Sequence, residues 1–312
     1  MRPIWIFGHR KCGTTLLTNL LDGHSKLLNY GSDLRIIYAI YNGFESYGSP
    51  TDVKKRFLKV FNDDRSDIDL INQGYVKDII DQLDFSNKDF VWHYLKLLDK
   101  KISRDFSDKR LFIKETSSEL YINSIKNCLD PQFIYVMRDP RDNWAAISAG
   151  VQSYYSQLGE ESLEAISSLI NRVNFGFNAY KRSLSFIDNA SKNIMLIKFE
   201  DLTKNNEKSM SDIANFLCID YESSLCNPTR NNSNYSGNSH DKISFKGVSS
   251  KNVGKFEERV NRKEIAIIEA LCKDAMLYFN YESITSTKEQ VIALEDFYSY
   301  YNQRYFFYDK YK

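Results

Sequence analysis

The stretch that decides the fold is residues 4–22, IWIFGHRKCGTTLLTNLLD. Its first residues, Ile4–Phe7, form a short apolar run that is typical of a buried strand. A glycine-bounded loop at 8–13 follows, and the sequence predicts a helix that begins at Thr14 and Thr15. The first amide N–H groups of a helix have no partner within it, and they favour negative charge. The stretch therefore predicts an anion site made of a strand, a loop and a helix N-terminus.

The lysine of this loop stands in an unusual place. The glycine spacing resembles the P-loop of nucleoside triphosphatases, G-x4-G-K-[ST], but Thr14 rather than a lysine follows Gly13. The lysine lies inside the loop as Lys11, beside Arg10. A P-loop lysine lies along the β- and γ-phosphates of a Mg-bound nucleotide, whereas Lys11 would lie beyond the first phosphate. This arrangement suits a nucleotide with one 5′-phosphate and a transferable group attached to it.

Length and composition are those of an ordinary globular protein. The 312 residues fit one large α/β domain or two smaller ones, and a 42% hydrophobic share supports a sizeable core. A net charge of +1 gives no bulk attraction to nucleic acid or membrane. The chain shows neither a membrane span nor a signal-peptide pattern. Five scattered cysteines and four scattered histidines predict a reduced, cytoplasmic protein without a metal cluster.

Apolar runs that predict buried parallel strands alternate with stretches of helical periodicity. The runs are Ile4–Phe7, Leu111–Ile113, Phe133–Met137 and Ile194–Phe199. We expect helices at about 14–22, 52–62, 75–84, 88–105, 119–128, 141–149, 160–188, 205–217, 262–279 and 288–306. The alternation predicts an α/β fold with an open parallel sheet flanked by helices. The segment 24–109 is too long for one crossover and is predicted to be a helical insertion, which either forms an acceptor pocket or is purely structural.

Two later segments differ in composition from the rest of the chain. Residues 227–255 are rich in Asn, Ser and Gly, but aromatic and apolar residues are interleaved with them, which favours an ordered functional loop over a linker. Residues 288–312 hold nine aromatic residues, more than one helix normally exposes to water. They predict docking onto the chain's own domain, or contact with another copy in a homo-oligomer. The predicted organisation is one domain at 1–285 and an aromatic helical extension at 286–312.

A second anchor for an anion lies in Phe133–Gly150, FIYVMRDPRDNWAAISAG. Arg138 comes at the carboxyl end of a predicted strand, where ligands bind in open α/β sheets. Asp139 suits the N-cap of the next helix, and Pro140 suits its first position. A guanidinium there can bind a phosphate bidentately, although an ion pair between Arg138 and a nearby carboxylate such as Asp142 explains it equally well.

These two segments, G-x-R-K-x-G-T-T-L and R-D-P-R-D, together resemble the sulfotransferases that use 3′-phosphoadenosine-5′-phosphosulfate (PAPS). Phe199-Glu200-Asp201-Leu202 resembles the family's Y/F-E-D-L segment after a strand. Three further pieces resemble C-terminal segments of prokaryotic members, which points to a prokaryotic, carbohydrate-type domain: Asn227-Pro228-Thr229, Ser236-Gly237-Asn238-Ser239 and Val253-Gly254-Lys255-Phe256. The resemblance covers about residues 2–282 and implies a P-loop-like sulfotransferase fold, with PAPS as sulfuryl donor and no metal.

The resemblance also implies which residues bind the donor. The 5′-phosphosulfate would be held by Arg10, Gly13, Thr14 and Thr15, while Lys11 would touch the bridging oxygen as the catalytic cation. Arg138 would hold the 3′-phosphate. The family pattern has a serine eight residues after this arginine, but this chain has Ala146 there, and the nearest serine is Ser148. The 3′-phosphate is therefore expected to rely on Arg138 and Ser148, or on Lys246 and Lys251 of the polar loop.

The acceptor hydroxyl needs a group that takes its proton. The stretch 111–120, LFIKETSSEL, resembles the family's glutamate segment and implies Glu115 as the base, with His93 as the alternative. The expected reaction is sulfuryl transfer to a hydroxyl of a small-molecule or oligosaccharide acceptor, on a carbohydrate or related metabolite. One alternative is a Mg-dependent P-loop kinase or NTPase, which Thr14 disfavours. Another is a non-catalytic nucleotide-binding protein, which Ala146 suggests.

Overall fold

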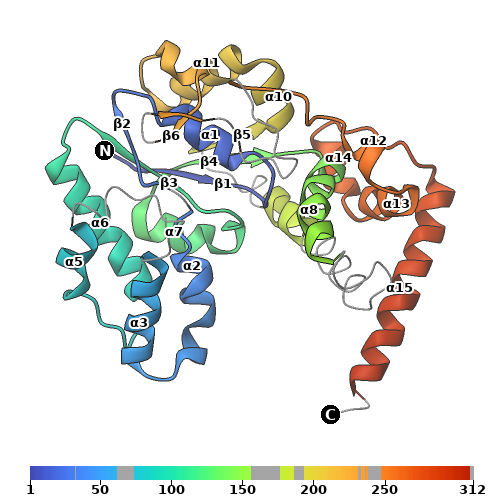
Figure 1. The fold of residues 1–312 in the computed structure, drawn as a ribbon, viewed down its shortest axis with the longest axis horizontal. Helices are drawn as coiled ribbons and strands as arrows, with labels where there is room; N and C mark the ends of the chain where they lie inside the picture. The colour runs from blue at the N-terminus through green and yellow to red at the C-terminus, as the bar shows by residue number, and fades with distance from the viewer. Residues whose placement is uncertain are drawn as a thin grey trace.

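The computed structural model describes residues 1–31, 33–61, 74–155, 176–185, 193–230, 233–235, 237 and 247–309. At 38, 148–155 and 300–309 it describes the backbone alone. Its centre is a five-stranded parallel sheet in the order β2-β3-β1-β4-β5 (Figure 1). The strands are β1 Ile4–Phe7, β2 Leu27–Asn29, β3 Arg110–Lys114, β4 Gln132–Met137 and β5 Ile194–Lys198. The sequence prediction of an open parallel sheet flanked by helices is confirmed.

The three central strands, β3, β1 and β4, bury both of their faces, because alternate side chains enter two different cores. Ile4 and Ile6 of β1 belong to the core under α1, α10 and α11, whereas Trp5 and Phe7 belong to a larger core on the opposite face. Figure 1 shows the first of these two helix groups on one side of the sheet and most of the second on the other, with α8 and α13 past one end of the strands. The first group is α1 Thr14–Leu21, α10 Phe199–Lys204 and α11 Asn206–Leu217. The second includes α2 Ile36–Ala39, α3 Pro50–Phe61, α5 Tyr75–Ile80, α6 Phe90–Asp105, α7 Ile122–Leu129, α8 Pro140–Tyr155 and α13 Arg262–Leu271.

Several predicted boundaries were wrong. The segment predicted as a helical insertion contains strand β2, which pairs with β3 at one edge of the sheet. Phe199 was predicted to end a strand, but it begins helix α10. The helix predicted at 262–279 divides at Cys272 into α13 and α14 Lys273–Tyr278. Most of the helix predicted at 160–188 lies outside the described residues, which are helical at 176–185.

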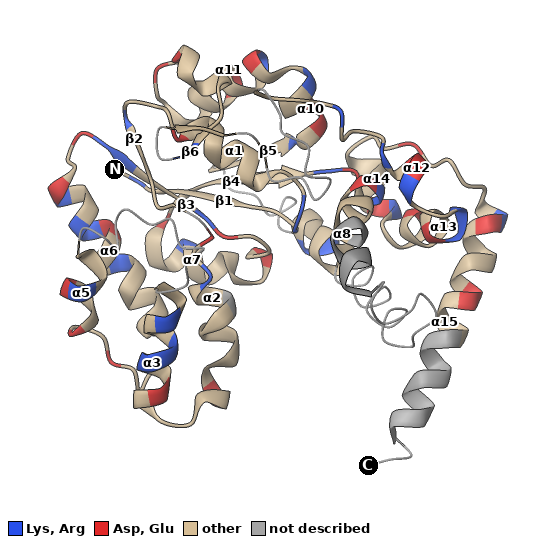
Figure 2. Ribbon diagram, viewed as in Figure 1, with Lys and Arg blue, Asp and Glu red and all other residues tan. Residues whose placement is uncertain are grey.

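The C-terminal helix, α15 Thr287–Asp309, runs along α13 and continues past it (Figure 1). Ala293 and Phe297 of its first half are buried in the larger core. Its role in contact with another copy stays a prediction, as does the domain boundary at 285. Over the described part of the chain, none of the helices is long and apolar enough to span a bilayer. Acidic and basic residues are interspersed over the outer helices (Figure 2).

Candidate active site

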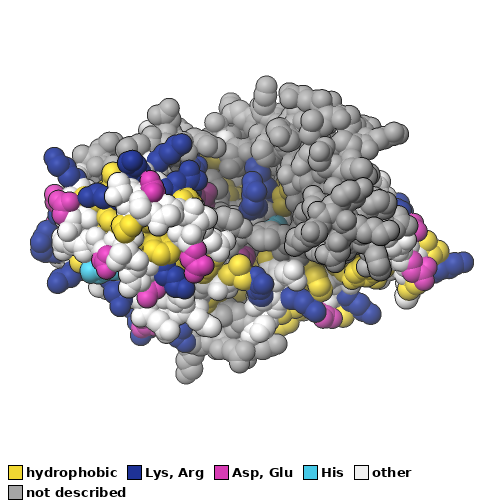
Figure 3. Space-filling view, turned by 90° about the horizontal axis from the view of Figure 1, so that it is seen from below, with side chains coloured by type: hydrophobic (Ala, Val, Ile, Leu, Met, Phe, Trp, Pro, Cys, Tyr) yellow, Lys and Arg dark blue, Asp and Glu magenta, His cyan; other side chains and the backbone are white. Residues whose placement is uncertain are grey.

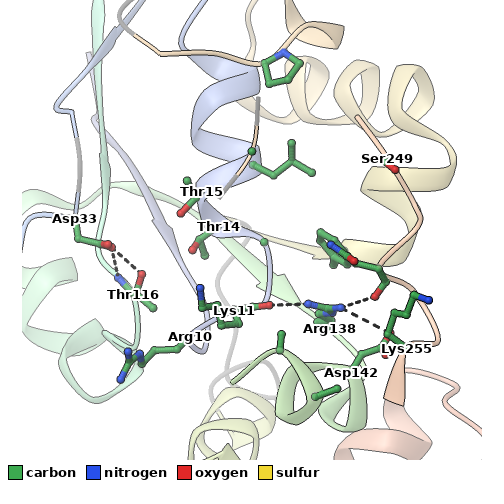
Figure 4. Close-up of a pocket in the computed structure, with 18 of the residues that line it drawn as sticks. Arg10, Lys11, Thr14, Thr15, Asp33, Thr116, Arg138, Asp142, Ser249 and Lys255 are labelled. Carbon is green, nitrogen blue, oxygen red and sulfur yellow. Dashed lines mark hydrogen bonds and ion pairs between the residues drawn. The ribbon is translucent and has the colours of Figure 1, made fainter. Parts of the chain in front are cut away.

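The site lies where the order of the strands reverses. Strand β1 sits between β3 and β4, so a crevice opens beyond its carboxyl end. The loop 8–13 leaves β1 at this point, while Glu115 follows β3 and Arg138 follows β4. Arg10, Lys11 and Gly13 of the loop, together with Glu115 and Arg138, line one pocket with a volume of about 500 Å³ (Figure 4). The fold thus brings together residues that are far apart in the sequence.

The loop after β1 has an unusual backbone that its neighbours hold in place. Lys11 has φ 66° and Gly13 has φ 105°, both in the left-handed region. A Cβ atom on Gly13 would lie 2.4 Å from Cδ2 of Phe199, so only glycine fits there. Two carbonyl groups of the loop accept hydrogen bonds from this side of the sheet: Asn143 Nδ2 of helix α8 donates to Arg10 O at 2.6 Å, and Arg138 Nη1, just before that helix, donates to Lys11 O at 3.1 Å. The two predicted cationic anchors are therefore joined by a direct hydrogen bond.

Arg138 is buried, and its guanidinium is fixed on several sides. Nη2 donates to Asn252 O at 2.5 Å, and the guanidinium lies 4.6 Å from the ring centroid of Phe199. Asp142 Oδ2 lies 3.9 Å from Nη2, so the ion pair that sequence reasoning had weighed is present. Within the described chain, however, Arg138 Nε is buried with no hydrogen-bond partner. A buried donor left without a partner is costly, so this atom is suited to bind an oxygen of a ligand.

Asp142 also fixes the far wall of the pocket. Its two carboxylate oxygens accept hydrogen bonds from Gly254 N at 2.7 Å and Phe256 N at 2.9 Å. The segment 247–259 is thereby held against α8, and its residues Gly247, Ser249, Asn252, Lys255 and Arg259 line the pocket. The polar loop predicted at 227–255 contributes Pro228, Tyr235 and Gly237 as well. The prediction that this loop is a functional one gains support from these positions.

The pocket is electropositive. Burial lowers the pKa of Lys11, and the charges of Arg10, Arg138 and Lys114 lower it further. Lys114 Nζ lies 3.2 Å from Thr15 Oγ1 and 3.0 Å from Asp33 Oδ2. Basic side chains are visible in the hollow near the middle of the face in Figure 3. Since a ligand with several negative charges would relieve the repulsion among these cations, the site is built for a polyanion.

The end of the pocket opposite Arg138 is polar and carries the candidate base. Glu115 is buried, and its Oε2 accepts a hydrogen bond from Arg35 N at 2.8 Å. Thr116 Oγ1 donates to Asp33 Oδ1 at 2.7 Å. Burial alone would raise the pKa of Asp33, but the charge of Lys114 and the bonds from Thr116 lower it overall. Sequence reasoning missed Asp33 and Arg35, because neither lies in a motif.

The other predicted site residues fall into three groups. Thr14, Thr15 and Ala146 line the pocket, so alanine stands at the wall where the family pattern has serine. Lys246 and the side chain of Ser148 lie outside the described residues. Lys251 and His93 are exposed, and neither lines the pocket. Among the described residues, no group of three or more His, Cys, Asp or Glu side chains is placed to hold a metal ion.

Comparison with known proteins identifies the family. A sequence model described as the sulfotransferase family matches residues 3–223. This chain belongs to the sulfotransferase family. A search of curated proteins finds no match.

Solved structures of other sulfotransferases share the fold. The sulfotransferase domain from the curacin biosynthetic pathway is 19% identical, with a TM-score of 0.59 over 90% of this chain and 98% of that domain. The sulfotransferase domain of the olefin synthase from Synechococcus PCC 7002 is 15% identical, with a TM-score of 0.56 over 90% and 94%. A mouse sulfotransferase in complex with PAP is 15% identical, with a TM-score of 0.50 over 89% and 85%.

Proposed function

We propose that this sulfotransferase moves a sulfuryl group from PAPS to a hydroxyl group of a polar acceptor, such as a carbohydrate or a related metabolite. The observation that carries the proposal is the direct contact between the two cationic anchors. Arg138 and Lys11 are 127 residues apart in the chain, yet the guanidinium of one binds the carbonyl of the other within a single pocket. Two linked cations of this kind suit the two phosphate groups of one adenosine bisphosphate.

The residues of the pocket fit such a donor. Arg138 lines the pocket and its buried Nε lacks a partner among the described residues, so we expect this guanidinium to gain a bond to the 3′-phosphate. Lys255 and Arg259 add positive charge to the same wall. Gly13 lets the start of α1 approach the 5′-phosphate closely, and the helix N-terminus there favours an anion. The mouse structural neighbour was solved with PAP, which supports a donor of this type.

The proposed mechanism is an in-line displacement at sulfur. When bound, PAPS supplies a sulfuryl group whose S–O bond to the 5′-phosphate breaks as a bond from sulfur to the acceptor oxygen forms. Lys11 and the amide groups at the start of α1 stabilise the charge that grows on the departing phosphate oxygen. Glu115 takes the proton of the acceptor hydroxyl. The hydroxyl groups of Thr14 and Thr15 help to hold the phosphate in line.

The polarity of the acceptor end supports a polar acceptor. Two of the segments that line the pocket, at 33–35 and 115–117, contribute only charged or hydroxyl side chains to it: Asp33, Arg35, Glu115, Thr116 and Ser117. Hydroxyl-rich ligands match such a wall because each polar group of the wall finds a hydrogen-bond partner. A flat apolar acceptor would cover these charged and hydroxyl groups without offering them any hydrogen bond.

Two experiments test the proposal, first a calorimetric binding measurement and then a sulfate transfer assay. We expect PAP without Mg²⁺ to bind more tightly than ATP with Mg²⁺, and the opposite order would favour a kinase or NTPase. We then expect transfer of labelled sulfate from PAPS to members of a panel of hydroxylated acceptors. Lys11→Ala should abolish transfer, whereas Lys208→Ala, at an exposed lysine of α11, should not. PAP binding without transfer to any acceptor would favour the non-catalytic alternative.

A further inference from the structure

Arg10 and Lys11 are adjacent in the loop, but their side chains leave it in different directions. Lys11 points toward Thr14 and Thr15, whereas Arg10 extends to the side of the pocket where Thr116 lies, away from Arg138 (Figure 4). Arg10 lines the pocket and is exposed, and its guanidinium makes no ion pair or side-chain hydrogen bond with any described residue. Its position is therefore on the acceptor side of Lys11, and its charge is available to a ligand.

A second cation reaches the same end from another segment. Arg35 lines the pocket and has φ 57°, a left-handed conformation that is unfavourable for an arginine. Its amide donates to Glu115 Oε2 at 2.8 Å, so this contact helps to hold the unfavourable backbone in place. Strained residues that neighbours hold in this way cluster at ligand-binding sites. Arg35 is thus placed directly beside the proposed base.

The negative charges at this end are already engaged. Asp33 is bound by Lys114 Nζ at 3.0 Å and by Thr116 Oγ1 at 2.7 Å, and Glu115 holds the amide of Arg35. Three cations, including Lys114, thus lie near two carboxylates, and the exposed guanidinium of Arg10 makes no ion pair with any described residue. An end with this excess of positive charge selects a ligand that carries negative charge.

We propose that the acceptor is itself an anion, a hydroxylated carboxylate or phosphate, and that Arg10 is the specificity-determining residue that binds its anionic group. This inference rests on the proposed function, since it assigns the acceptor end of the same pocket. It also gives Arg10 a different role from the one that the family resemblance implies, namely a contact with the donor's phosphosulfate. Arg35 supports the same selection from the opposite segment.

Binding to the PAP-saturated protein tests this proposal, because PAP occupies the donor cations. The probes are glucuronate, glucose 6-phosphate and glucose, which share a hydroxylated ring and differ in bearing a carboxylate, a phosphate or neither group. Calorimetry at constant ionic strength compares the wild type with Arg10→Gln and with Arg56→Gln, a control at an exposed arginine of α3. We expect one anionic probe to bind roughly tenfold more tightly than glucose, as one charge-assisted hydrogen bond provides. Which probe binds identifies the anionic group.

Arg10→Gln should remove this preference and leave the affinity for PAP unchanged, while Arg56→Gln should change neither. Equal binding of the three probes, no binding of either anion, or a preference that survives in Arg10→Gln would overturn the proposal. A loss of PAP affinity in Arg10→Gln would overturn it as well, since Arg10 would then hold the donor. If the wild type does not bind PAP, the proposed function itself fails, and this inference fails with it.

Discussion

Replacing Lys11 by methionine should change the sulfate transfer rate and the stability of the fold in opposite directions. The folded environment lowers the pKa of Lys11, chiefly through burial and then through the charges of Arg10, Arg138 and Lys114. A lysine with a lowered pKa binds its proton less tightly in the folded protein than in the unfolded chain. Its charge therefore reduces stability below the folded pKa, and this loss is relieved as the pH rises past that value. Methionine keeps most of the stem without the charge, so we expect the unliganded variant to be more stable.

The two expected effects of Lys11→Met have opposite signs and different sizes. Substitutions that relieve a functional strain commonly add about 0.5–2 kcal/mol to the free energy of unfolding. Because Lys11 is partly exposed, solvent screens its repulsion, and we expect about 0.5 kcal/mol, or roughly 1–2 °C in Tm. By contrast, losing a preorganised donor to the departing oxygen costs about 10²–10³ in the transfer rate, or about 2.7–4 kcal/mol.

Thermal unfolding without ligand and single-turnover sulfate transfer measure these two quantities on the same preparation. Lys208→Met is the matched control, because the Lys208 side chain is 80% exposed and pairs with Asp212 away from the pocket. The control should leave the transfer rate unchanged. If Lys11→Met unfolds several degrees below the wild type, the lysine stabilises the fold, which contradicts the prediction. A variant that retains more than about a tenth of the transfer rate would show that Lys11 is not the cation that stabilises the departing oxygen.

Three further predictions concern single side chains. Arg138→Lys keeps a charge but cannot bind the carbonyls of Lys11 and Asn252 together, so calorimetry should show roughly 100-fold weaker PAP binding; a loss below tenfold would contradict its role. Ala146→Ser places a hydroxyl on the pocket wall and should tighten PAP binding about fivefold, whereas unchanged affinity would place this wall away from the 3′-phosphate. Burial raises the pKa of Glu119 from 4.5 to about 7 in the folded protein, so the ionised carboxylate is disfavoured there. The free energy of unfolding of the wild type should therefore fall as the pH rises through this interval. In urea titrations Glu119→Gln should therefore gain stability relative to the wild type between about pH 5 and about pH 8, and an equal difference at both pH values would refute this.

The parts of the site that sequence alone predicted are those whose chemistry is local or follows from the geometry of a parallel sheet. The glycines and cations of the loop are neighbours in the chain, so their spacing was informative. Arg138 and Glu115 could be placed near the loop, because parallel strands end at one edge of the sheet. Alternation along β3 also accounts for Lys114: it lies two residues after Phe112, whose face packs against α1, and so it reaches Thr15.

The missed parts depend on contacts between distant segments. Strand β2 has three residues, too few to show an alternating pattern, and its pairing with β3 arises only in the folded chain. The left-handed backbone of Arg35 has no signature of its own, since a glycine or asparagine would normally be expected there. Likewise, the bond from Asn143 to Arg10 O joins a helix to a loop more than 100 residues away. Such contacts leave no periodic trace in the sequence.

The R-D-P-R-D segment divides its charges between the ligand site and the fold. Arg138 and Asp142 hold the pocket, whereas Arg141 turns away from it and binds Asp139 Oδ2 and Glu269 Oε1, both at 2.6 Å. Glu269 in turn accepts the amide of Thr285 at 3.0 Å, just before α15 begins. Removing one partner of a buried charge network typically costs about 3–5 kcal/mol. The helix that carries the aromatic tail is therefore anchored, through buried charges, to the same turn that presents Arg138.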